Sequence, residues 1–441
     1  MKTKLQLLIL LISISTLSYG QFYTEYATTF NDASRGIRQI SIVNDNVVWA
    51  IAYDGSGGGA NVQELTLSVD GGLTWQSKAI NLGGGTGGLG IAQISAIDAN
   101  TAWIVAYPNS AFGRGGIWKT VDAGDSWTKQ VSAVYNDASS FSNVVNFWDA
   151  NNGFCQGDPI GGYYELYTTN DGGTNWTRVP SSGIPSPLSG EYGYVSQLEV
   201  VGNRMWWTTN KGRIFRSDDK GLTHQVFQSP ISDFGSAAMS GNISFWDANN
   251  GLLLNSLGEL WGTTDGGETW VSKGNVDNVG SDIECIVGTT KAVFTGSNGA
   301  SPAVSNSSYS LDSGNTWTLI DNVQRLELEF SATTGFAGGF NTDNLTGGMF
   351  KYTGTELGLA SVVDNEIASF NAYPNPINNN LTIEGVNIIS NVSIYNMLGQ
   401  KVLESNPNEL VVLLDVSNFK AGSYFVKVTI NNAIETMKIV K

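Results

Sequence analysis

Short apolar runs separated by turn-forming residues recur along the chain from about residue 35 to residue 352. Val47–Tyr53 follows the polar segment Asn44–Asn46, and Ala102–Tyr107 follows Asp98–Asn100. Runs of this length, bounded by Asn, Asp and Gly, are typical of β-strands joined by tight turns. The pattern therefore predicts an all-β protein built from many short strands.

One motif, Ser/Thr-x-Asp-x-Gly-x-x-Trp, recurs with these runs, and in its fourth copy His224 replaces the Trp. The mean spacing of its copies is about 48 residues, which suits a four-stranded propeller blade. In a hairpin of this kind the carboxylate accepts hydrogen bonds from backbone N–H groups, the Gly adopts a positive φ and the Trp packs inward. We therefore expect the six aspartates to hold turns, and His224 to pack rather than to act as a base. The six are Asp70, Asp122, Asp171, Asp219, Asp265 and Asp312.

These residues match the Asp-box of BNR/sialidase-like and photosystem-assembly-factor-like β-propellers, and the middle of the chain resembles that superfamily. The resemblance implies a propeller, and the strand pairs that precede the boxes indicate seven blades between residues 21 and 355. The seventh pair, Leu326–Phe330 and Gly335–Phe340, leads into Gly348–Tyr352 with no box after it. We expect the run Phe22–Phe30 to supply the missing outer strand and to close the ring.

The first twenty residues are predicted to be a secretory signal peptide. Lys2 and Lys4 precede an apolar stretch, Leu5–Ile14, and small residues precede a cleavage point at Gln21. No later stretch reaches the 18 or so apolar residues that a transmembrane helix requires. The mature protein is therefore expected to leave the cytoplasm.

The C-terminal segment forms a separate unit in this interpretation. A linker over residues 356–370 precedes a domain over residues 371–441, in which Tyr373–Pro376, Val392–Gln400 and Gly422–Val428 alternate apolar runs with Asn and Gly. Such alternation suggests a small β-sandwich. The segment resembles the type A C-terminal sorting domain of the type IX secretion system of Bacteroidetes. The resemblance implies that the protein engages that machinery and reaches the outer cell surface or the medium through the periplasm; an ordinary accessory sandwich is the alternative.

Composition excludes several classes of function. Asp and Glu number 39 against 23 Lys and Arg, and the net charge of −16 disfavours nucleic acid as a partner. One histidine and two cysteines cannot build a multi-His or Cys-based zinc site, so we expect no metal and no cofactor. Cys155 and Cys285 lie in apolar runs, which favours buried thiols over a disulfide.

Candidate chemistry lies in the loops on the face opposite the Asp-box turns. Gly157–Glu165 and the following loop combine acids with aromatic rings, and both carbohydrate hydrolysis and carbohydrate binding use that combination. Asp158 and Glu191 are the candidate catalytic acids, with turn capping or simple solvation as the alternatives. The candidate ligand-binding residues are Arg114, Tyr163, Tyr164, Glu165, Tyr192 and Arg213.

Two functions remain open from the sequence. The preferred interpretation is an exported propeller that binds a glycan or a surface protein without turnover. The alternative is a glycoside hydrolase, which would need two carboxylates roughly 5–10 Å apart in one cleft, one of them with a raised pKa. A sialidase is disfavoured, because Ser34–Arg38 does not form the Phe-Arg-Ile-Pro motif of that family.

Overall fold

A computed structural model describes residues 22–83, 88–108, 114–236, 239–276, 280–296, 305–359, 370–397, 399–430 and 433–441. The predicted signal peptide and residues 360–369 of the predicted linker lie outside the described residues. The chain divides into two compact units with a boundary after residue 360. No described helix has the length and apolarity that crossing a membrane requires.

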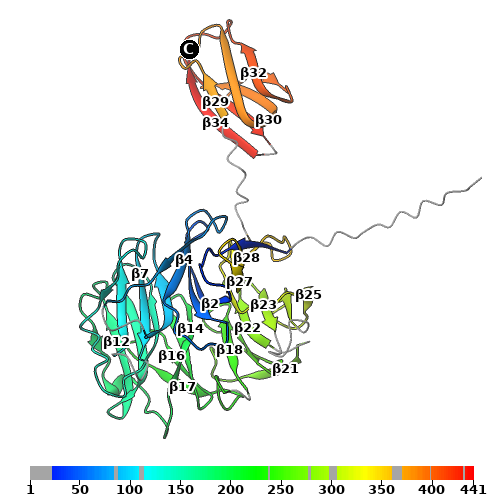
Figure 1. The fold of residues 1–441 in the computed structure, drawn as a ribbon. Coiled ribbons are helices and arrows are strands. Elements are labelled where there is room, and N and C mark those ends of the chain that lie inside the picture. Colours follow the sequence, from blue (N-terminus) through cyan, green and yellow to red (C-terminus); the bar gives the residue numbers. More distant parts are fainter. Residues whose placement is uncertain are drawn as a thin grey trace, which may run out of the picture. The chain divides into compact units, whose positions relative to one another are not determined.

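The described part of the first unit is a seven-bladed β-propeller, as expected (Figure 1). Each blade is a four-stranded antiparallel sheet, and consecutive strands of a blade are neighbours. Strands are given from the inner to the outer edge of each blade. Blade 1 consists of β2 (Arg35–Ile42), β3 (Val48–Asp54), β4 (Glu64–Ser68) and β5 (Gln76–Ala79), and blade 2 consists of β6 (Gly90–Ala96), β7 (Ala102–Tyr107), β8 (Gly116–Thr120) and β9 (Thr128–Lys129). Blade 3 consists of β10 (Ser142–Phe147), β11 (Gly153–Ile160), β12 (Tyr163–Thr169) and β13 (Thr177–Arg178). A short 3-10 helix, Ser181–Gly183, follows blade 3.

The remaining blades repeat the arrangement. Blade 4 consists of β14 (Gly193–Val201), β15 (Arg204–Thr209), β16 (Arg213–Ser217) and β17 (Gln225–Gln228), and blade 5 consists of β18 (Gly241–Phe245), β19 (Gly251–Asn255), β20 (Glu259–Thr263) and β21 (Val271–Asn275). Blade 6 consists of β22 (Gly280–Cys285), β23 (Ala292–Gly296), β24 (Asn306–Ser310) and β25 (Thr318–Asp321). Blade 7 is β26 (Glu327–Phe330), β27 (Gly335–Asp343), β28 (Thr346–Tyr352) and, from the start of the chain, β1 (Tyr23–Ala27).

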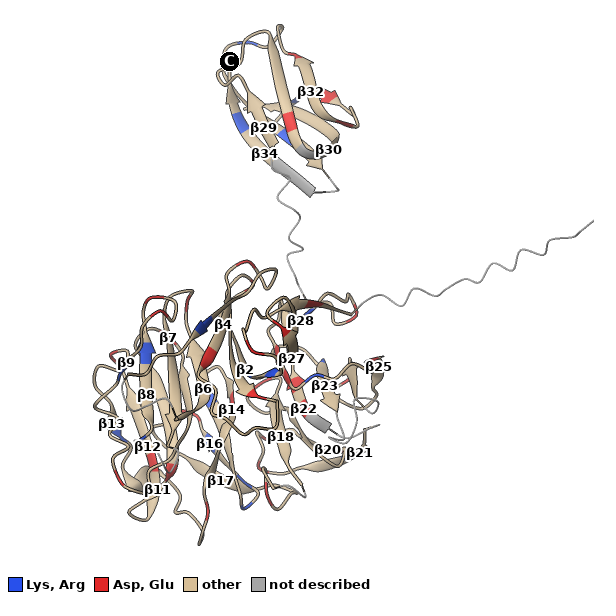
Figure 2. Cartoon of the chain, viewed as in Figure 1, with Lys and Arg blue, Asp and Glu red and all other residues tan. Residues whose placement is uncertain are grey.

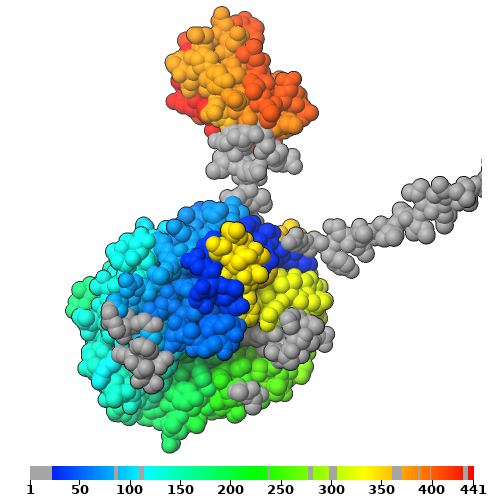
Figure 3. Space-filling view, in the orientation of Figure 1, coloured from blue at the N-terminus to red at the C-terminus, as the bar shows by residue number. Residues whose placement is uncertain are grey.

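The N-terminal strand closes the ring, which confirms the expectation from the missing seventh box. β1 pairs antiparallel with β28 from Tyr23 opposite Tyr352 to Ala27 opposite Gly348. In Figure 3 the dark blue residues near the N-terminus lie beside the yellow residues of blade 7. The Arg325 guanidinium lies 3.9 Å from the centre of the Tyr23 ring and pairs with Asp321. Blade 7 is thus completed by both ends of the propeller's chain.

The Asp-box turns share one hydrogen-bond network, seen clearly in blade 5. The Thr263 hydroxyl donates to Asp265 Oδ1 at 2.8 Å, and the Thr269 N–H donates to the same oxygen at 2.9 Å. The Gly266 N–H donates to the Asn249 carbonyl at 2.8 Å, which ties the box to the turn between strands β18 and β19. The box turns and the turns between first and second strands therefore lie on the same face of the propeller.

Buried aromatic rings join neighbouring blades. Trp103 stacks on Phe147 with centroids 3.5 Å apart, and Trp206 stacks on Phe245 at 3.9 Å. His224, at the box position that elsewhere holds Trp, is buried beside Phe154, and burial lowers its pKa to about 4. The imidazole is therefore neutral and part of the core.

Both cysteines are buried free thiols, as the apolar runs around them predicted. Cys155 lies on β11 and Cys285 at the end of β22. Burial raises the pKa of each thiol, so neither is a reactive thiolate.

The second unit is a small β-sandwich built around one long strand. β30 pairs through its first half with β29 and β32, and through its second half with β31 and β33. Because β30 belongs to both layers, its inward residues, among them Leu381 and Ile394, fill a single core. The strands are β29 (Phe370–Tyr373), β30 (Asn380–Asn396), β31 (Lys401–Ser405), β32 (Glu409–Asp415), β33 (Ser423–Ile430) and β34 (Ala433–Val440).

Candidate functional site

Asp158 lies at a bulge in β11, where the register with β12 shifts between Gly157 and Pro159. Its Oδ1 accepts hydrogen bonds from Asn143 Nδ2 at 2.8 Å and from the Gly193 N–H at 3.1 Å. Burial raises the pKa of this carboxyl to about 6 against the opposing effect of the two donors. Asp158 therefore links blade 3 to the start of blade 4.

Glu191 is almost fully buried, with 4% of its surface exposed, and both of its oxygens are occupied. Oε1 accepts from the Thr209 hydroxyl at 2.7 Å and from Arg213 Nε at 2.8 Å. Oε2 accepts from the Leu188 N–H at 2.7 Å and from Arg213 Nη2. Burial alone would raise the pKa of Glu191, but these donors outweigh it and the pKa is lowered. The carboxylate stays ionised and cannot donate a proton near neutral pH.

The segment Gly157–Glu165 was expected to be a loop, and that expectation is wrong. β11 continues to Ile160, and a two-residue turn of Gly161 and Gly162, both with positive φ, leads directly into β12. Such a turn matches the twist of the flanking strands, so the pair forms a tight hairpin. Along β12, the four consecutive residues from Tyr164 to Tyr167 are buried.

Two of the predicted ligand-binding residues lie in the interior, and a third, Arg213, is largely buried with 13% of its side chain exposed. Tyr164 is fully buried against Trp207 and Phe215, and Glu165 is buried and accepts the Tyr167 hydroxyl at 2.9 Å. Arg213, which the structure pairs with Glu191, is the third. A ligand on this face would not contact Tyr164 or Glu165.

The other three remain accessible in part. Tyr192 is 43% exposed and lies edge-on to Tyr194, whose hydroxyl donates to Asp233 at 2.6 Å. Tyr163 lies under the Arg178 guanidinium at 4.1 Å, and Arg114 is exposed. The structure does not bring these three into one cavity with Asp158.

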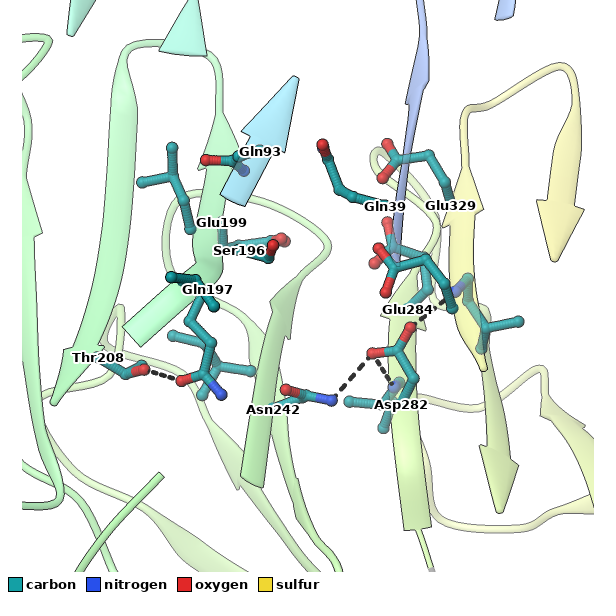
Figure 4. A pocket seen from close by; sticks show the side chains of 16 residues that line it. Gln39, Gln93, Ser196, Gln197, Glu199, Thr208, Asn242, Asp282, Glu284 and Glu329 are labelled. Carbon is teal, nitrogen blue, oxygen red and sulfur yellow. Dashed lines mark hydrogen bonds between the residues drawn. The ribbon is translucent and has the colours of Figure 1, made fainter. Parts of the chain in front are cut away.

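A polar channel runs along the inner strands at the centre of the propeller. Two connected cavities, of about 230 and 390 Å³, are lined by the first strands of all seven blades. Figure 4 shows Glu199, Gln93 and Ser196 on one side of the first cavity and Glu284, Glu329 and Gln39 on the other. None of the candidate residues predicted from the sequence lines these two cavities.

Most of the polar residues in the channel connect neighbouring blades. Gln39 Oε1 accepts the Ile94 N–H at 2.8 Å, and Gln93 Oε1 accepts the Val145 N–H at 2.9 Å. Later in the ring, Glu199 and Asp282 accept N–H groups of β18 and β26 at 2.8 and 2.7 Å. The inner strands are sheet edges, and unpaired buried N–H groups are costly. These side chains therefore satisfy the inner edge of the next blade.

Blades 4, 6 and 7 add a concentration of acidic residues to this channel. Its five carboxyl groups are Glu199, Asp282, Glu284, Glu327 and Glu329. Burial raises the pKa of all five, to about 8 for Glu199 and Glu329, and repulsion from neighbouring carboxylates adds to the rise for all of them except Asp282. Several of the carboxyls therefore hold their protons at neutral pH.

Counter-charge in the channel is limited. Arg38 opposes the rise in the pKa of Glu327. Figure 2 shows acidic positions outnumbering basic ones over the strands and loops of the propeller. Within the described residues no three His, Cys, Asp or Glu side chains are grouped so as to hold a metal ion.

A bulge in blade 4 narrows one end of the channel. The register between β14 and β15 shifts between Gly193 and Leu198, and Ser196 adopts a φ of +59°. The Ser196 hydroxyl donates to the Ala92 carbonyl of blade 2, past the intervening blade 3. The bulge thus crosses part of the channel opening.

Comparison with known proteins assigns the C-terminal unit. Residues 371–441 match the family described as the secretion system C-terminal sorting domain. This match indicates that the chain is exported by a secretion system, and the first unit shares the β-propeller fold of the solved structures described next. The resemblances stated from the sequence are confirmed.

Particular relatives share parts of this architecture. The ulvan lyase NLR42 of Nonlabens ulvanivorans is 31% identical over 162 residues, which cover 32% of this chain and 28% of the lyase. YCF48 bound to D1 peptide superposes with a TM-score of 0.53 at 17% identity, over 77% of this chain and 98% of that one. The extracellular domain of the hybrid two-component system BT4673 from B. thetaiotaomicron superposes with a TM-score of 0.56 at 12% identity, over 96% of this chain and 59% of that one. The two structures share the fold, and the lyase match spans little more than a quarter of that enzyme's length.

Proposed function

We propose that this protein is an exported, non-catalytic binding propeller whose ligand is a glycan, delivered to the outer cell surface or the medium. The observation that carries the proposal is the ion pair that the buried Glu191 carboxylate forms with Arg213. A hydrolase of the predicted kind needs Glu191 as a free acid or nucleophile. Its oxygens instead accept four hydrogen bonds within the protein.

Export supports a role outside the cell. The sorting domain engages the secretion machinery, and the propeller is the cargo that this domain delivers. Rigid scaffolds with many surface loops are well suited to recognition, because loops can vary without disturbing the core. A glycan or surface protein met outside the cell is therefore the class of partner that we expect.

Binding and turnover can be measured on the same sample. The mature protein is titrated with a panel of oligosaccharides by calorimetry, and the products are then separated to look for new reducing ends or unsaturated sugars. We expect heat of binding with the oligosaccharide recovered intact. Chain cleavage by the wild-type protein would contradict the non-catalytic assignment.

One observation favours the second candidate, a carboxylate-dependent glycoside hydrolase. The pKa of Asp158, raised to about 6 by burial, lies in the range useful to a general acid. If cleavage occurs, Asp158→Asn should abolish it while the variant keeps the melting temperature of the wild type within a few degrees. Cleavage that survives this substitution would remove Asp158 from the reaction.

A further inference from the structure

Two grooves of equivalent construction lie at the seams between blades 3 and 4 and between blades 5 and 6. We call them groove 3/4, lined among others by Trp148, Thr168 and Asn175, and groove 5/6, lined by Trp246 and Gly262. Their volumes are about 280 and 630 Å³. Each groove is lined by residues from the Asp-box turn of the earlier blade and by residues from the Asp-box turn of the next blade.

The grooves are open because of one position in the repeat, the residue just before the Ser or Thr of the Asp-box. In blade 2 it is Lys119, whose Nζ crosses the seam and donates to the Gly172 carbonyl of blade 3 at 3.1 Å. In blade 4 it is Arg216, which reaches the Asp265 carbonyl of blade 5 at 3.0 Å. In blades 3 and 5 the same position holds Thr168 and Gly262, which are too short to cross. Neither residue bridges the seam that follows its blade, although Lys273 of β21 crosses the seam after blade 5 to reach Asn315.

The same two blades carry an indole at a second repeated position. The turn between their first two strands reads Trp-Asp-Ala-Asn-Asn at 148–152 and at 246–250, and no other blade has Trp there. Trp148 Nε1 donates to the Gly202 carbonyl at 2.8 Å and Trp246 Nε1 to the Lys291 carbonyl at 2.5 Å, so each indole reaches the next blade. A small residue and a tryptophan thus occur together at both of these grooves.

Polar side chains in the grooves are held in place before any ligand arrives. The Asn152 amide donates to both oxygens of Asp149, at 3.0 and 2.8 Å, and the Asn250 amide does the same to Asp247. Fixed groups lose little freedom on binding, which favours affinity.

The chemistry of the linings identifies the class of ligand. Threonine hydroxyls and asparagine amides both donate and accept hydrogen bonds, as sugar hydroxyls do. The exposed part of the Trp148 indole offers an apolar surface to the C–H groups of a sugar ring, whereas Trp246 is 4% exposed and forms the buried wall of its groove. The lysines are already engaged, since Lys273 donates to Asn315 Oδ1 at 2.8 Å and Lys220 lies 5.5 Å from the Trp148 ring. A net charge of −16 also repels acidic polysaccharides.

We propose that groove 3/4 and groove 5/6 are two equivalent binding sites for a neutral oligosaccharide. The proposal rests on the glycan-binding function proposed above and gives that function a location on the Asp-box face, away from the loops selected from the sequence. The larger groove falls within the range of about 300–1,000 Å³ typical of small-molecule sites, and the smaller lies just below it. Two sites on one rigid ring could engage one polysaccharide chain and gain avidity.

The protein's own repeat supplies the variants for the test. Thr168→Lys and Gly262→Lys copy the lysine of blade 2 into blades 3 and 5 and should fill one groove each. Val131→Lys, at a position 81% exposed outside both grooves, adds the same charge as a matched control. Asn170→Arg and Thr264→Arg, at exposed positions on the groove rims, provide a second pair should the first impair folding.

The mature protein is titrated with cellohexaose, xylohexaose, mannohexaose and laminarihexaose, with oligogalacturonate as the acidic comparison. We expect one neutral hexasaccharide to bind at two sites per chain, each single lysine variant to retain one site, and the double variant to lose at least about tenfold in affinity. Val131→Lys should bind as the wild type does.

Other outcomes separate the two proposals. A folded double variant that binds like the wild type overturns the grooves as sites and leaves the binding function standing. Preferred binding of oligogalacturonate in the grooves overturns the neutral class of ligand. A wild-type protein that binds none of the five saccharides overturns the grooves and the proposed glycan-binding function together.

Discussion

Each Asp-box aspartate accepts hydrogen bonds from the backbone and the side chain of the residue four positions ahead. These donors outweigh the effect of burial and lower the pKa of Asp265, and in blade 2 they lower the pKa of Asp122 to about 2. A group whose folded pKa is depressed stabilises the fold above its ordinary pKa of about 3.9, and this contribution disappears as the pH falls toward the folded value. The boxes should therefore weaken together between about pH 4 and pH 2.

Asp265→Ala tests the structural role of one box. The substitution leaves the Thr269 N–H and hydroxyl without their acceptor, and we expect a loss of about 1 kcal/mol in the free energy of unfolding. Asp265→Asn, which keeps one oxygen acceptor, should lose less. Chemical denaturation at pH 7 measures the free energy of unfolding of both variants. Equal stability of the alanine variant and the wild type would contradict the proposed role of Asp265 in holding the turn.

Glu329→Gln tests the acidic channel. Its pKa is raised by burial and by the neighbouring Glu199 and Asp282, to about 8. A carboxyl with a raised folded pKa favours the fold at low pH, and this contribution is lost as the pH rises from about 4.3 through 8. We expect the variant to melt a few degrees higher than the wild type at pH 8.5 and at nearly the same temperature at pH 4.5. A difference that is constant across this range would contradict the assigned protonation.

Local hydrogen-bond patterns made the Asp-box residues predictable, whereas the channel acids were missed. The box bonds span four residues, so the motif contains its own partners. Asp282 and Glu284 alternate with apolar residues on β22, as Glu327 and Glu329 do on β26, and that alternation could have placed both pairs on one face. Their raised pKa values depend on assembly of the whole ring, which no single segment reveals.

At the scale of elements, ring closure by β1 is the feature with the greatest consequence for stability. The strand supplies the outer edge of blade 7 and buries Tyr23 under Arg325 and against Tyr352. Without it, β28 would present an unpaired edge and an exposed apolar side.

A mature protein that begins at Phe30 instead of Gln21 tests the closure. We expect a cooperative loss of thermal stability and faster proteolysis of blade 7, because β1 contributes five residue pairs to β28. Removal of the sorting domain from the same mature protein is the control truncation. Because the two units are separate, we expect it to leave the melting temperature of the propeller unchanged. An N-terminal truncation that melts like the full propeller would show that the ring is closed elsewhere.

The strand order was predictable because each blade repeats, but the prediction missed two irregular elements. The hairpin at Gly161 and Gly162 was taken for part of a loop, although a Gly-Gly pair between strand-like runs is a recognised hairpin signal. The bulge at Ser196 depends on a contact with Ala92, more than a hundred residues earlier, so its register is fixed by tertiary structure.

At the scale of the whole molecule, the two units have separate tasks. The propeller and the sorting domain each have their own hydrophobic core, and the contact pattern separates them after residue 360. The sorting match over residues 371–441 falls entirely within the second unit.

Truncation of the chain from Leu414 tests the export route. The deletion removes the end of β32 together with β33 and β34, so the sandwich cannot form. We expect the truncated protein to remain within the cell envelope, as fractionation and immunoblotting would show, while the full chain reaches the surface or the medium. Normal release of the truncated protein would contradict export through this domain.

The central claim is that the propeller recognises a glycan at its blade seams and leaves it intact. A crystal structure of the propeller with the neutral oligosaccharide selected by titration tests this most directly. We predict an unbroken saccharide chain beside Trp246 in groove 5/6, with a second copy beside Trp148. A saccharide bound in the central channel between Glu284 and Glu329, or a cleaved product at Asp158, would contradict it.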